Sequence, residues 1–545
     1  MRVVGAWFAL FALVASLHVS FGVKRTEEAP AAAVRPPDGV WDRQKKAADD
    51  LWEELTEGGR RATDHEHWER IVRRSSLEWY DPYYEDDTQH IVDVQDYYRY
   101  VLEQDWYAEP QQDQLASILH DWRGDQARIQ MEDDYMYMEK PIPGRYIVML
   151  DASANERMLD HAITVLQRAH VESEGKIRTE HITPIRNLGL GFTATMNNKA
   201  VTLITKYPYL EVIEEDVAVK RSTRQLSKAD YEKAEQHLSG VQWNLDRIDQ
   251  RNNHLDGVFK PEGTGDMASI YIIDTGVRYT HEEFEGRAKY AGFDAIDKLT
   301  GSSQQGADCQ GHGTHCAATA AGKKYGVAKK AKIYSLRALG CGGSGAVSGI
   351  VEGMDFVAKQ VDKGVHSGPV VFSMSLGVKA SVSLNAAIKR VTEKGIVAVS
   401  AAGNQGGDSC NYSPASARVG IAVGATNKED DMVTFSNAGE CTDIYAPGVA
   451  IKSATSKCDT CTLTLSGTSM AAPHVAGYMA ILMSLYPHMS ATQAKGHLVT
   501  QSTKGAVGLA AISSSLASRT PNRFLYVAAQ DVDTSTRAHI PYWRP

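Results

Sequence analysis

The sequence lacks the excess of basic residues that nucleic-acid-binding proteins carry. Its 545 residues include 58 Lys and Arg against 67 Asp and Glu, a formal net charge of −9. Because Lys and Arg neutralise phosphates, this balance argues against a nucleic-acid partner. The composition is not that of a disordered or fibrous chain either, since 43% of the residues are hydrophobic and 23% are charged. At about 100 to 200 residues per domain, we expect about three structural units.

Long apolar runs are scarce as well. One uncharged run, residues 3–17, follows Arg2 and precedes a cleavage-type segment at residues 18–22, and no later run is as long. This order is typical of a secretory signal peptide, predicted over residues 1–22. The alternative is a membrane anchor, but a spanning helix needs roughly twenty apolar residues. We therefore expect no stable membrane anchor and a product that is secreted or delivered to the lumen of the secretory or lysosomal pathway.

Cysteine is rare, and all seven cysteines lie between residues 309 and 461. An oxidising compartment would pair most of them, with one left over or bonded to another chain. Cys458 and Cys461 form a C-x-x-C without a second C-x-x-C or an H-x-x-x-H partner. The motif therefore favours a tight local disulfide over a zinc or redox site.

The chain changes character several times before its main domain. Residues 23–143 form an acidic extension rich in aromatic residues; within residues 76–140 seventeen acidic residues stand against four basic ones, a local charge of −13. Such a segment is predicted to be solvated or to fold only against a neighbour, although the apolar spacing in residues 91–101 is helical. Residues 144–220 have the pattern of a small α+β unit, and the polar residues 221–240 that of a cleavable linker.

Residues 241–530 alternate short apolar runs with amphipathic segments, and residues 531–545 form a C-terminal tail. Strands are predicted at 269–273, 331–339, 369–374, 396–400 and 420–423, and helices at 348–363, 384–394 and 470–485. This alternation argues for an α/β fold with a parallel sheet covered on both faces. In such sheets the reactive groups lie at the carboxyl ends of the strands.

Three blocks in this region carry reactive side chains beside small residues. Asp274 ends the apolar strand of SIYIIDTG, His312 lies between two glycines in DCQGHGTHC, and Ser469 opens a helix in SGTSMAAP. Each alone has a structural explanation as a turn, loop or N-cap residue. Together, in the order Asp, His, Ser, they match one of the chain orders that converge on a serine protease triad.

The residue types predict the roles. Ser469 is the expected nucleophile, and His312 is the base and then the acid, because imidazole exchanges protons near neutral pH. Asp274 would hold the imidazole tautomer and stabilise the imidazolium. Asn404, which follows the strand of IVAVSAAGN, and the backbone N–H of Ser469 would stabilise the oxyanion.

With these motifs, residues 242–526 resemble a subtilisin-like serine protease of the proteinase K subfamily, and residues 144–216 are similar to the inhibitor-type propeptide of such enzymes. The resemblance implies a subtilisin-like parallel sheet with helices on both faces, preceded by a small α+β propeptide domain. It also implies an endopeptidase that forms an acyl-enzyme and acts broadly on protein or peptide substrates, with a preference for apolar or aromatic residues.

The resemblance further assigns substrate binding to two segments that would flank an extended peptide and to the wall of the primary pocket. These residues are Gly343, Ser344, Gly345, Ser375, Leu376, Gly377, Ala401, Ala402 and Gly403. It implies a structural calcium ion on Asp443 and the carbonyls of Arg418 and Gly420. It also implies packing roles for His315 and His474.

By the same resemblance, Cys309 would pair with Cys341, Cys410 with Cys441 and Cys458 with Cys461, which leaves Cys316 as a free thiol beneath the catalytic histidine. No cofactor is expected for catalysis.

The propeptide of such a zymogen acts as an intramolecular chaperone and inhibitor until it is removed. Its cleavage point is left open between Arg221, Arg224 and residues 238–240. The alternative function is that of a self-processing, convertase-like binding protein that keeps its propeptide bound. The acidic extension, the disulfide pattern and the segment VQWNLDRI resemble those of a convertase, and this resemblance favours the alternative.

Overall fold

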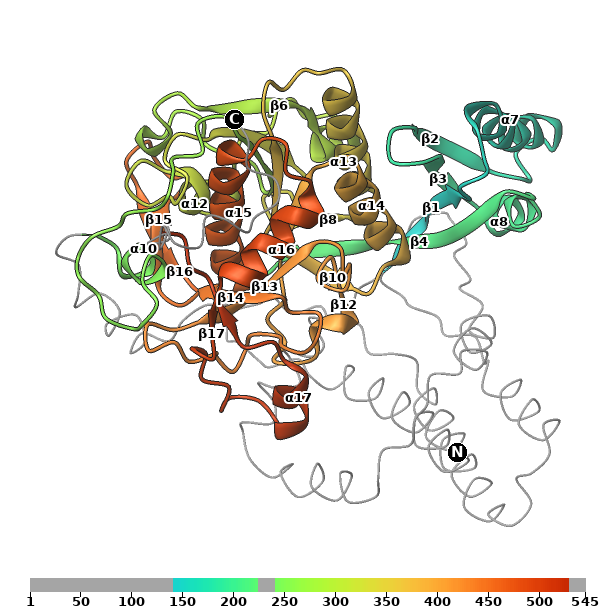
Figure 1. Ribbon diagram of the computed structural model, residues 1–545. Coiled ribbons are helices and arrows are strands. Elements are labelled where there is room, and N and C mark those ends of the chain that lie inside the picture. The colour runs from blue at the N-terminus through green and yellow to red at the C-terminus, as the bar shows by residue number, and fades with distance from the viewer. Residues whose placement is uncertain (1–140, 224–240, 529–545) are drawn as a thin grey trace, which may run out of the picture. The chain divides into compact units, whose positions relative to one another are not determined.

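The structure is a computed structural model and describes residues 141–223 and 241–528 (Figure 1). The predicted signal peptide, the acidic extension with its helical segment, most of the linker and the C-terminal tail lie outside the described residues. Within the described part of the chain, none of the helices combines the length and the apolar character that crossing a membrane requires.

The larger part is built on a nine-stranded sheet. Its central strands all pair in parallel: β7 (Lys332–Arg337), β5 (Ser269–Asp274), β9 (Val370–Met374), β11 (Val397–Ala401) and β13 (Ile421–Thr426). These are the five predicted strands, shifted by at most a few residues at their ends. The parallel sheet predicted from the alternating pattern is therefore confirmed.

Shorter strands complete this sheet at its two edges. β6 (Ala288–Asp294) lies beside β7, while β14 (Ile444–Pro447) and β18 (Arg523–Phe524) continue the parallel order beyond β13. β17 (Thr503–Lys504) closes this edge antiparallel to β18.

Helices cover both faces of the sheet. The buried core on one face includes residues of α12 (His312–Ala321), α15 (Thr468–Leu485) and α16 (Ala491–Gln501), and the core on the other face includes residues of α13 (Val347–Asp362) and α14 (Val382–Glu393). α15 is buried along nearly its whole length, which explains why its sequence is apolar on every side.

Strand β5 illustrates how the sequence divides the two cores. Ile270 and Ile272 pack with the α12 and α15 side, and Tyr271 and Ile273 pack with the α13 and α14 side. Since side chains alternate along a strand, an uninterrupted apolar run buries both faces. The run ends at Asp274, at the carboxyl edge of the sheet.

Residues 141–221 form an α+β unit, which begins three residues before and ends one residue after the unit predicted at residues 144–220. Its strands follow the order β4-β1-β3-β2 and pair antiparallel, and two helices pack on one face. The elements are β1 (Pro141–Leu150), α7 (Glu156–Glu172), β2 (Thr179–Ile185), β3 (Gly191–Met196), α8 (Asn198–Ile204) and β4 (Leu210–Arg221). The other face of β1 contributes Ile147 and Met149 to the core that contains α13 and α14.

Strand β4 extends further than the sequence predicted. The pattern ended the strand at residue 216, but β4 continues to Arg221 because it acquires two partners beyond its own unit (Figure 1). These partners are β8 (Ser344–Ala346) and β10 (Leu376–Lys379), which hold β4 between them. The end of the predicted propeptide is therefore part of a sheet shared with the larger domain.

Short elements fill the remaining connections. They are α10 (Trp243–Ile248), η2 (Glu282–Phe284), α11 (Ala295–Thr300), η3 (Ser409–Asn411), β12 (Tyr412–Ser413), β15 (Ile451–Ala454), β16 (Thr462–Leu465) and α17 (Ser514–Arg519). Three disulfides join Cys309 to Cys341, Cys410 to Cys441 and Cys458 to Cys461. Cys316 is free and buried.

Candidate active site

Asp274 and His312 form a buried hydrogen-bonded pair. Asp274 ends β5 and His312 begins α12, and His312 Nδ1 lies 2.7 Å from Asp274 Oδ1 with both side chains 1% exposed. The backbone N–H of Thr275 donates to the same carboxylate oxygen at 2.7 Å. A carboxylate at Nδ1 favours the tautomer that carries its proton there, so Nε2 is left to accept a proton.

The loop before His312 is held by Asp308, a residue that the sequence analysis did not select. Its carboxylate accepts hydrogen bonds from the backbone N–H of Gly311 at 2.8 Å and of Thr314 at 3.0 Å, and from the Thr275 hydroxyl at 3.0 Å. Gly311 has φ +107°, where a Cβ would lie 2.7 Å from a threonine oxygen. An Asp that precedes such a turn is the signal that could have identified it.

Ser469 is the second residue of α15. Its hydroxyl oxygen is in a very short contact with Ser222 O and lies 3.0 Å from Ser375 O, so its single proton has two carbonyl acceptors. Its backbone N–H also donates to Ser222 O, at 3.3 Å. Among the described residues the imidazole of His312 is not a hydrogen-bond partner of this hydroxyl. Of the predicted triad, Asp274 and His312 are therefore bonded to each other, whereas the Ser469 hydroxyl is bonded to backbone carbonyls of the same chain.

Cys316 lies between His312 and the Ser469 backbone. Its sulfur is 3.9 Å from His312 Nε2 and contacts the Ser469 carbonyl oxygen at 3.4 Å, and Ser375 Oγ donates to that same oxygen at 2.8 Å. Burial, reinforced by the charge of Asp274, raises the pKa of the Cys316 thiol well above its usual value. A thiol that stays protonated is a poor nucleophile, so this sulfur acts as a packing group.

Asn404 lies just beyond the end of β11. Its Oδ1 accepts from the N–H and the hydroxyl of Thr468, both at 2.9 Å, while its Nδ2 is buried without a hydrogen-bond partner. A Cβ added to Gly467 would lie 3.1 Å from Asn404 Nδ2 and 2.7 Å from Ser222 O, so both atoms lie close to Gly467. The unpaired amide therefore lies in the region that holds the Ser222 carbonyl and the Ser469 N–H.

The two predicted substrate-binding segments pair with β4. Ala346, Gly345 and Ser344 on β8 face residues 218–220, and Leu376 and Gly377 on β10 face residues 221 and 220. Both pairings are antiparallel. An extended chain inserted between two strands in this way gains main-chain hydrogen bonds on both edges.

The hydrogen bonds continue past the end of β4. The N–H of Arg221 donates to Gly343 O and the N–H of Ser222 donates to Ser375 O, both at 3.1 Å. The backbone is thus held on both sides up to the carbonyl that contacts Ser469. All six predicted residues of the two segments lie along this strand.

The predicted pocket wall lies beside Asn404. Ala401 ends β11, and Ala401, Ala402 and Gly403 are all buried. The Gly403 N–H donates to the Thr468 hydroxyl at 3.2 Å. Gly403 has φ +104°, and a Cβ there would lie 2.3 Å from an asparagine nitrogen, so this backbone path requires glycine.

The three predicted calcium ligands come together, but they surround a lysine. Nζ of Lys495 lies 2.8 Å from Asp443 Oδ1, 2.8 Å from Arg418 O and 2.5 Å from Gly420 O. Calcium takes about six to eight oxygen ligands at roughly 2.3 to 2.6 Å. Since an ammonium group already contacts all three oxygens, these residues do not fit the predicted ion.

His315 and His474 are buried outside the pair of Asp274 and His312. His315 Nε2 lies 2.9 Å from Ile451 O, and His474 Nδ1 lies 2.8 Å from Met470 O. Burial lowers the pKa of His315 to about 3 and that of His474 to about 4. Both imidazoles are neutral, in agreement with the structural roles that the resemblance implied.

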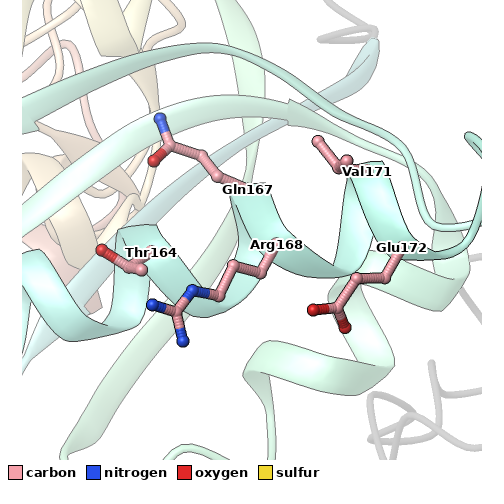
Figure 2. A pocket seen from close by; sticks show the side chains of 5 residues that line it. All are labelled: Thr164, Gln167, Arg168, Val171 and Glu172. Atoms are coloured by element: carbon pink, nitrogen blue, oxygen red, sulfur yellow. The ribbon is translucent and has the colours of Figure 1, made fainter.

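A shallow hollow of about 270 Å³ runs along α7 (Figure 2). It is lined by Thr164, Gln167, Arg168, Val171 and Glu172. All five residues belong to one helix, and none is a predicted site residue. The reactive groups gather at the carboxyl ends of β5 and β11 instead.

Comparison with known proteins gives one family and several relatives. The model of the subtilase family, Peptidase_S8, matches residues 265–517. An extracellular serine proteinase of Thermus sp. (strain Rt41A) is 38% identical over 71% of this chain and 90% of its own length. Alkaline serine exoprotease A of Vibrio alginolyticus is 40% identical over 58% of this chain and 56% of its own length.

A third relative is proprotein convertase subtilisin/kexin type 9 of Rattus norvegicus, 34% identical over 70% of this chain and 53% of its own length. The chain therefore spans a little over half of the last two relatives. A solved structure of a cold-adapted subtilisin-like serine proteinase matches with a TM-score of 0.49 and 41% identity, over 54% of this chain and 100% of that one.

Proposed function

Because this chain belongs to the subtilase family of serine endopeptidases, we propose that it is a secreted zymogen that cuts peptide bonds with Ser469, His312 and Asp274. The observation that carries the proposal is the buried 2.7 Å hydrogen bond between His312 Nδ1 and Asp274 Oδ1. The contact of the Ser469 hydroxyl with a peptide carbonyl oxygen supports it. The extracellular relative from Thermus supports secretion.

The reaction begins when the Ser469 hydroxyl turns from its carbonyl partners toward His312 Nε2. As Oγ bonds to the substrate carbonyl carbon, its proton passes to Nε2, and Asp274 stabilises the imidazolium. The N–H of Ser469 and the unpaired Nδ2 of Asn404 donate to the oxyanion. The C–N bond then breaks, His312 returns the proton to the leaving amine, and water hydrolyses the acyl-enzyme by the same steps in reverse.

Substrates bind as an extended strand between β8 and β10, in the place that β4 takes within this chain. Main-chain pairing of this kind selects a conformation rather than a sequence. The preference comes from the wall formed by residues 401–403, which are small and uncharged. We expect a broad preference for apolar or aromatic residues before the cut bond.

The first substrate is the chain itself, and the favoured bond is Ser222–Thr223. Ser222 O contacts both the hydroxyl and the N–H of Ser469, and the Ser222 N–H is held by Ser375 O at 3.1 Å. This bond lies between two of the cleavage points that the sequence left open, Arg221 and Arg224. After the cut, β4 would stay in the groove as an inhibitor.

Ser469→Ala tests the proposed chemistry. The variant should remain uncut, fail to digest casein and fail to react with a fluorophosphonate probe. Ser484→Ala, on the same helix, is the matched control, because Ser484 Oγ bonds only the preceding turn at Ala480 O within the described chain. Casein digestion by a matured Ser469→Ala protein would refute the proposal.

N-terminal sequencing of the wild-type product tests the self-cleavage site separately. A chain that begins at Thr223 is expected. A first cut within residues 224–241, with no product that starts at Thr223, would contradict the site while leaving the triad proposal intact.

A second candidate function is a self-processing protein that keeps residues 141–222 bound. Two carboxylates of the small unit favour this function, because each lies at the N-terminus of a helix of the larger domain. Glu214 accepts a hydrogen bond from the N–H of Ser383 on α14 at 2.8 Å. Asp216 accepts one from the N–H of Ser348 on α13 at 3.0 Å. An inert complex that never releases this unit would support this candidate. Free enzyme that cleaves peptides would exclude it.

A further inference from the structure

The ammonium group of Lys495 has a complete set of acceptors. Its nitrogen lies 2.8 Å from Arg418 O, 2.5 Å from Gly420 O and 2.8 Å from Asp443 Oδ1. A lysine ammonium has three N–H donors and no acceptor. Two carbonyls and one carboxylate therefore satisfy every donor of this group.

The acceptors are held in place independently of the lysine. Asp443 Oδ2 accepts from the N–H of Ala422 at 3.0 Å, and the N–H of Asp443 donates to Ala422 O at 2.9 Å. The N–H of Gly420 donates to Ala417 O at 2.8 Å and closes the turn that supplies the two carbonyls. The three oxygens thus form a fixed cradle before a cation enters it.

Lys495 brings its charge from a different element, the middle of α16. The side chains of Lys495 and Asp443 are only 19% and 16% exposed, so the pair is screened less by solvent than an ordinary surface ion pair. The lysine connects α16 to the turn before β13 and to the segment before β14.

We propose that Lys495 is a built-in cation that replaces a divalent metal ion at this cradle. Because the charge is part of the chain, it does not dissociate and is not removed by a chelator. The ammonium excludes a metal ion from Arg418 O, Gly420 O and Asp443 Oδ1. Removal of the side chain leaves two carbonyls and a carboxylate, the oxygen ligands that calcium prefers.

The first test leaves Lys495 in place and counts bound calcium. The full chain carrying Ser469→Ala, which prevents self-digestion, is freed of metal and titrated with calcium chloride by calorimetry, with and without Asp443→Asn. The proposal expects the same number of ions per chain in both proteins. One ion fewer in the Asp443→Asn protein would overturn it, because the carboxylate would then hold calcium in the presence of the lysine.

The second test removes the lysine in the same background. Lys495→Ala should lower the thermal midpoint in a chelator, and millimolar calcium should raise it again by about 4 °C or more. The calcium response should disappear in the double variant Lys495→Ala/Asp443→Asn. A matched control is Lys394→Ala, because within the described residues the Lys394 ammonium bonds the Asp362 carboxylate, at 2.7 Å, and no backbone carbonyl. Its calcium response should equal that of the parent protein.

If Lys495→Ala responds to calcium no more than the parent protein does, the proposal is wrong. This result would mean that the cradle has no affinity for a divalent ion. Because every comparison is between variants of one protein, calcium bound elsewhere in the chain does not alter the outcome.

Discussion

Two buried neutral histidines should make this protein sensitive to acid. His315 and His474 have pKa values lowered by burial to about 3 and about 4, whereas an exposed histidine titrates near 6.5. Below about pH 6.5 the unfolded chain therefore binds more protons than the folded chain, and the free energy of unfolding falls as the pH falls. The stabilisation is present above about pH 6.5 and is lost progressively as the pH falls, toward about pH 4 for His474 and about pH 3 for His315.

The size of the loss follows from these pKa values. Each pKa unit corresponds to about 1.4 kcal/mol. Between pH 7 and pH 5 each histidine then removes roughly 2 kcal/mol from the free energy of unfolding, and the two together about 4 kcal/mol. This is a large part of the roughly 5 to 15 kcal/mol that stabilises a typical domain.

Urea unfolding of the Ser469→Ala protein at a series of pH values measures this effect. His474→Gln should remove about half of the loss between pH 7 and pH 5, whatever its stability at pH 7. His254→Gln is the matched control, because His254 is exposed, and it should keep the full pH dependence. An identical pH dependence in the His474→Gln and parent proteins would refute the reasoning.

Two further predictions concern the hold of the small unit and the disulfides. Asp355 Oδ1 accepts hydrogen bonds from the N–H groups of residues 186, 187 and 188 at 3.1, 2.6 and 3.0 Å. Asp355→Ala should therefore weaken the binding of residues 141–222 by about 2 kcal/mol, or roughly 30-fold, as measured by co-purification. Equal retention in the variant and the parent protein would contradict this. Replacing Cys309 and Cys341 by serine opens a link with a sequence separation of 32 and should lower the free energy of unfolding by about 3 to 4 kcal/mol, and urea denaturation with no loss would count against it.

The sequence predicted the parts of the fold that local patterns determine. The helix expected over residues 348–363 is α13 at Val347–Asp362, and the apolar strand before Asp274 is β5. Both elements need only hydrophobic periodicity and the residues that end each element. The pair of Asp274 and His312 was instead expected from three short motifs in the order Asp, His, Ser, which matches a known chain order of the serine protease triad.

The features that the sequence missed depend on distant partners. The apolar run at residues 217–219 was expected only to lead the chain out of the small unit. β4 continues through it because it pairs with β8, more than a hundred residues away, and no local pattern encodes that register. Lys495 gave no signal, because a lysine on a short helix usually faces solvent. Its carbonyl partners lie 75 and 77 positions away, so the calcium prediction named these two carbonyls without the lysine that occupies them.

Because β4 pairs with both β8 and β10, a foreign peptide must displace β4 before it can bind between these two strands. A strand tethered beside its own binding site experiences an effective concentration on the order of millimolar, which dilute foreign peptides cannot match. Once the tether is cut and the small unit diffuses away, that advantage disappears. If the chain is a secreted zymogen as proposed, the released unit would be more concentrated in a crowded secretory compartment than in extracellular fluid, and the same molecule should have very different activities in the two places.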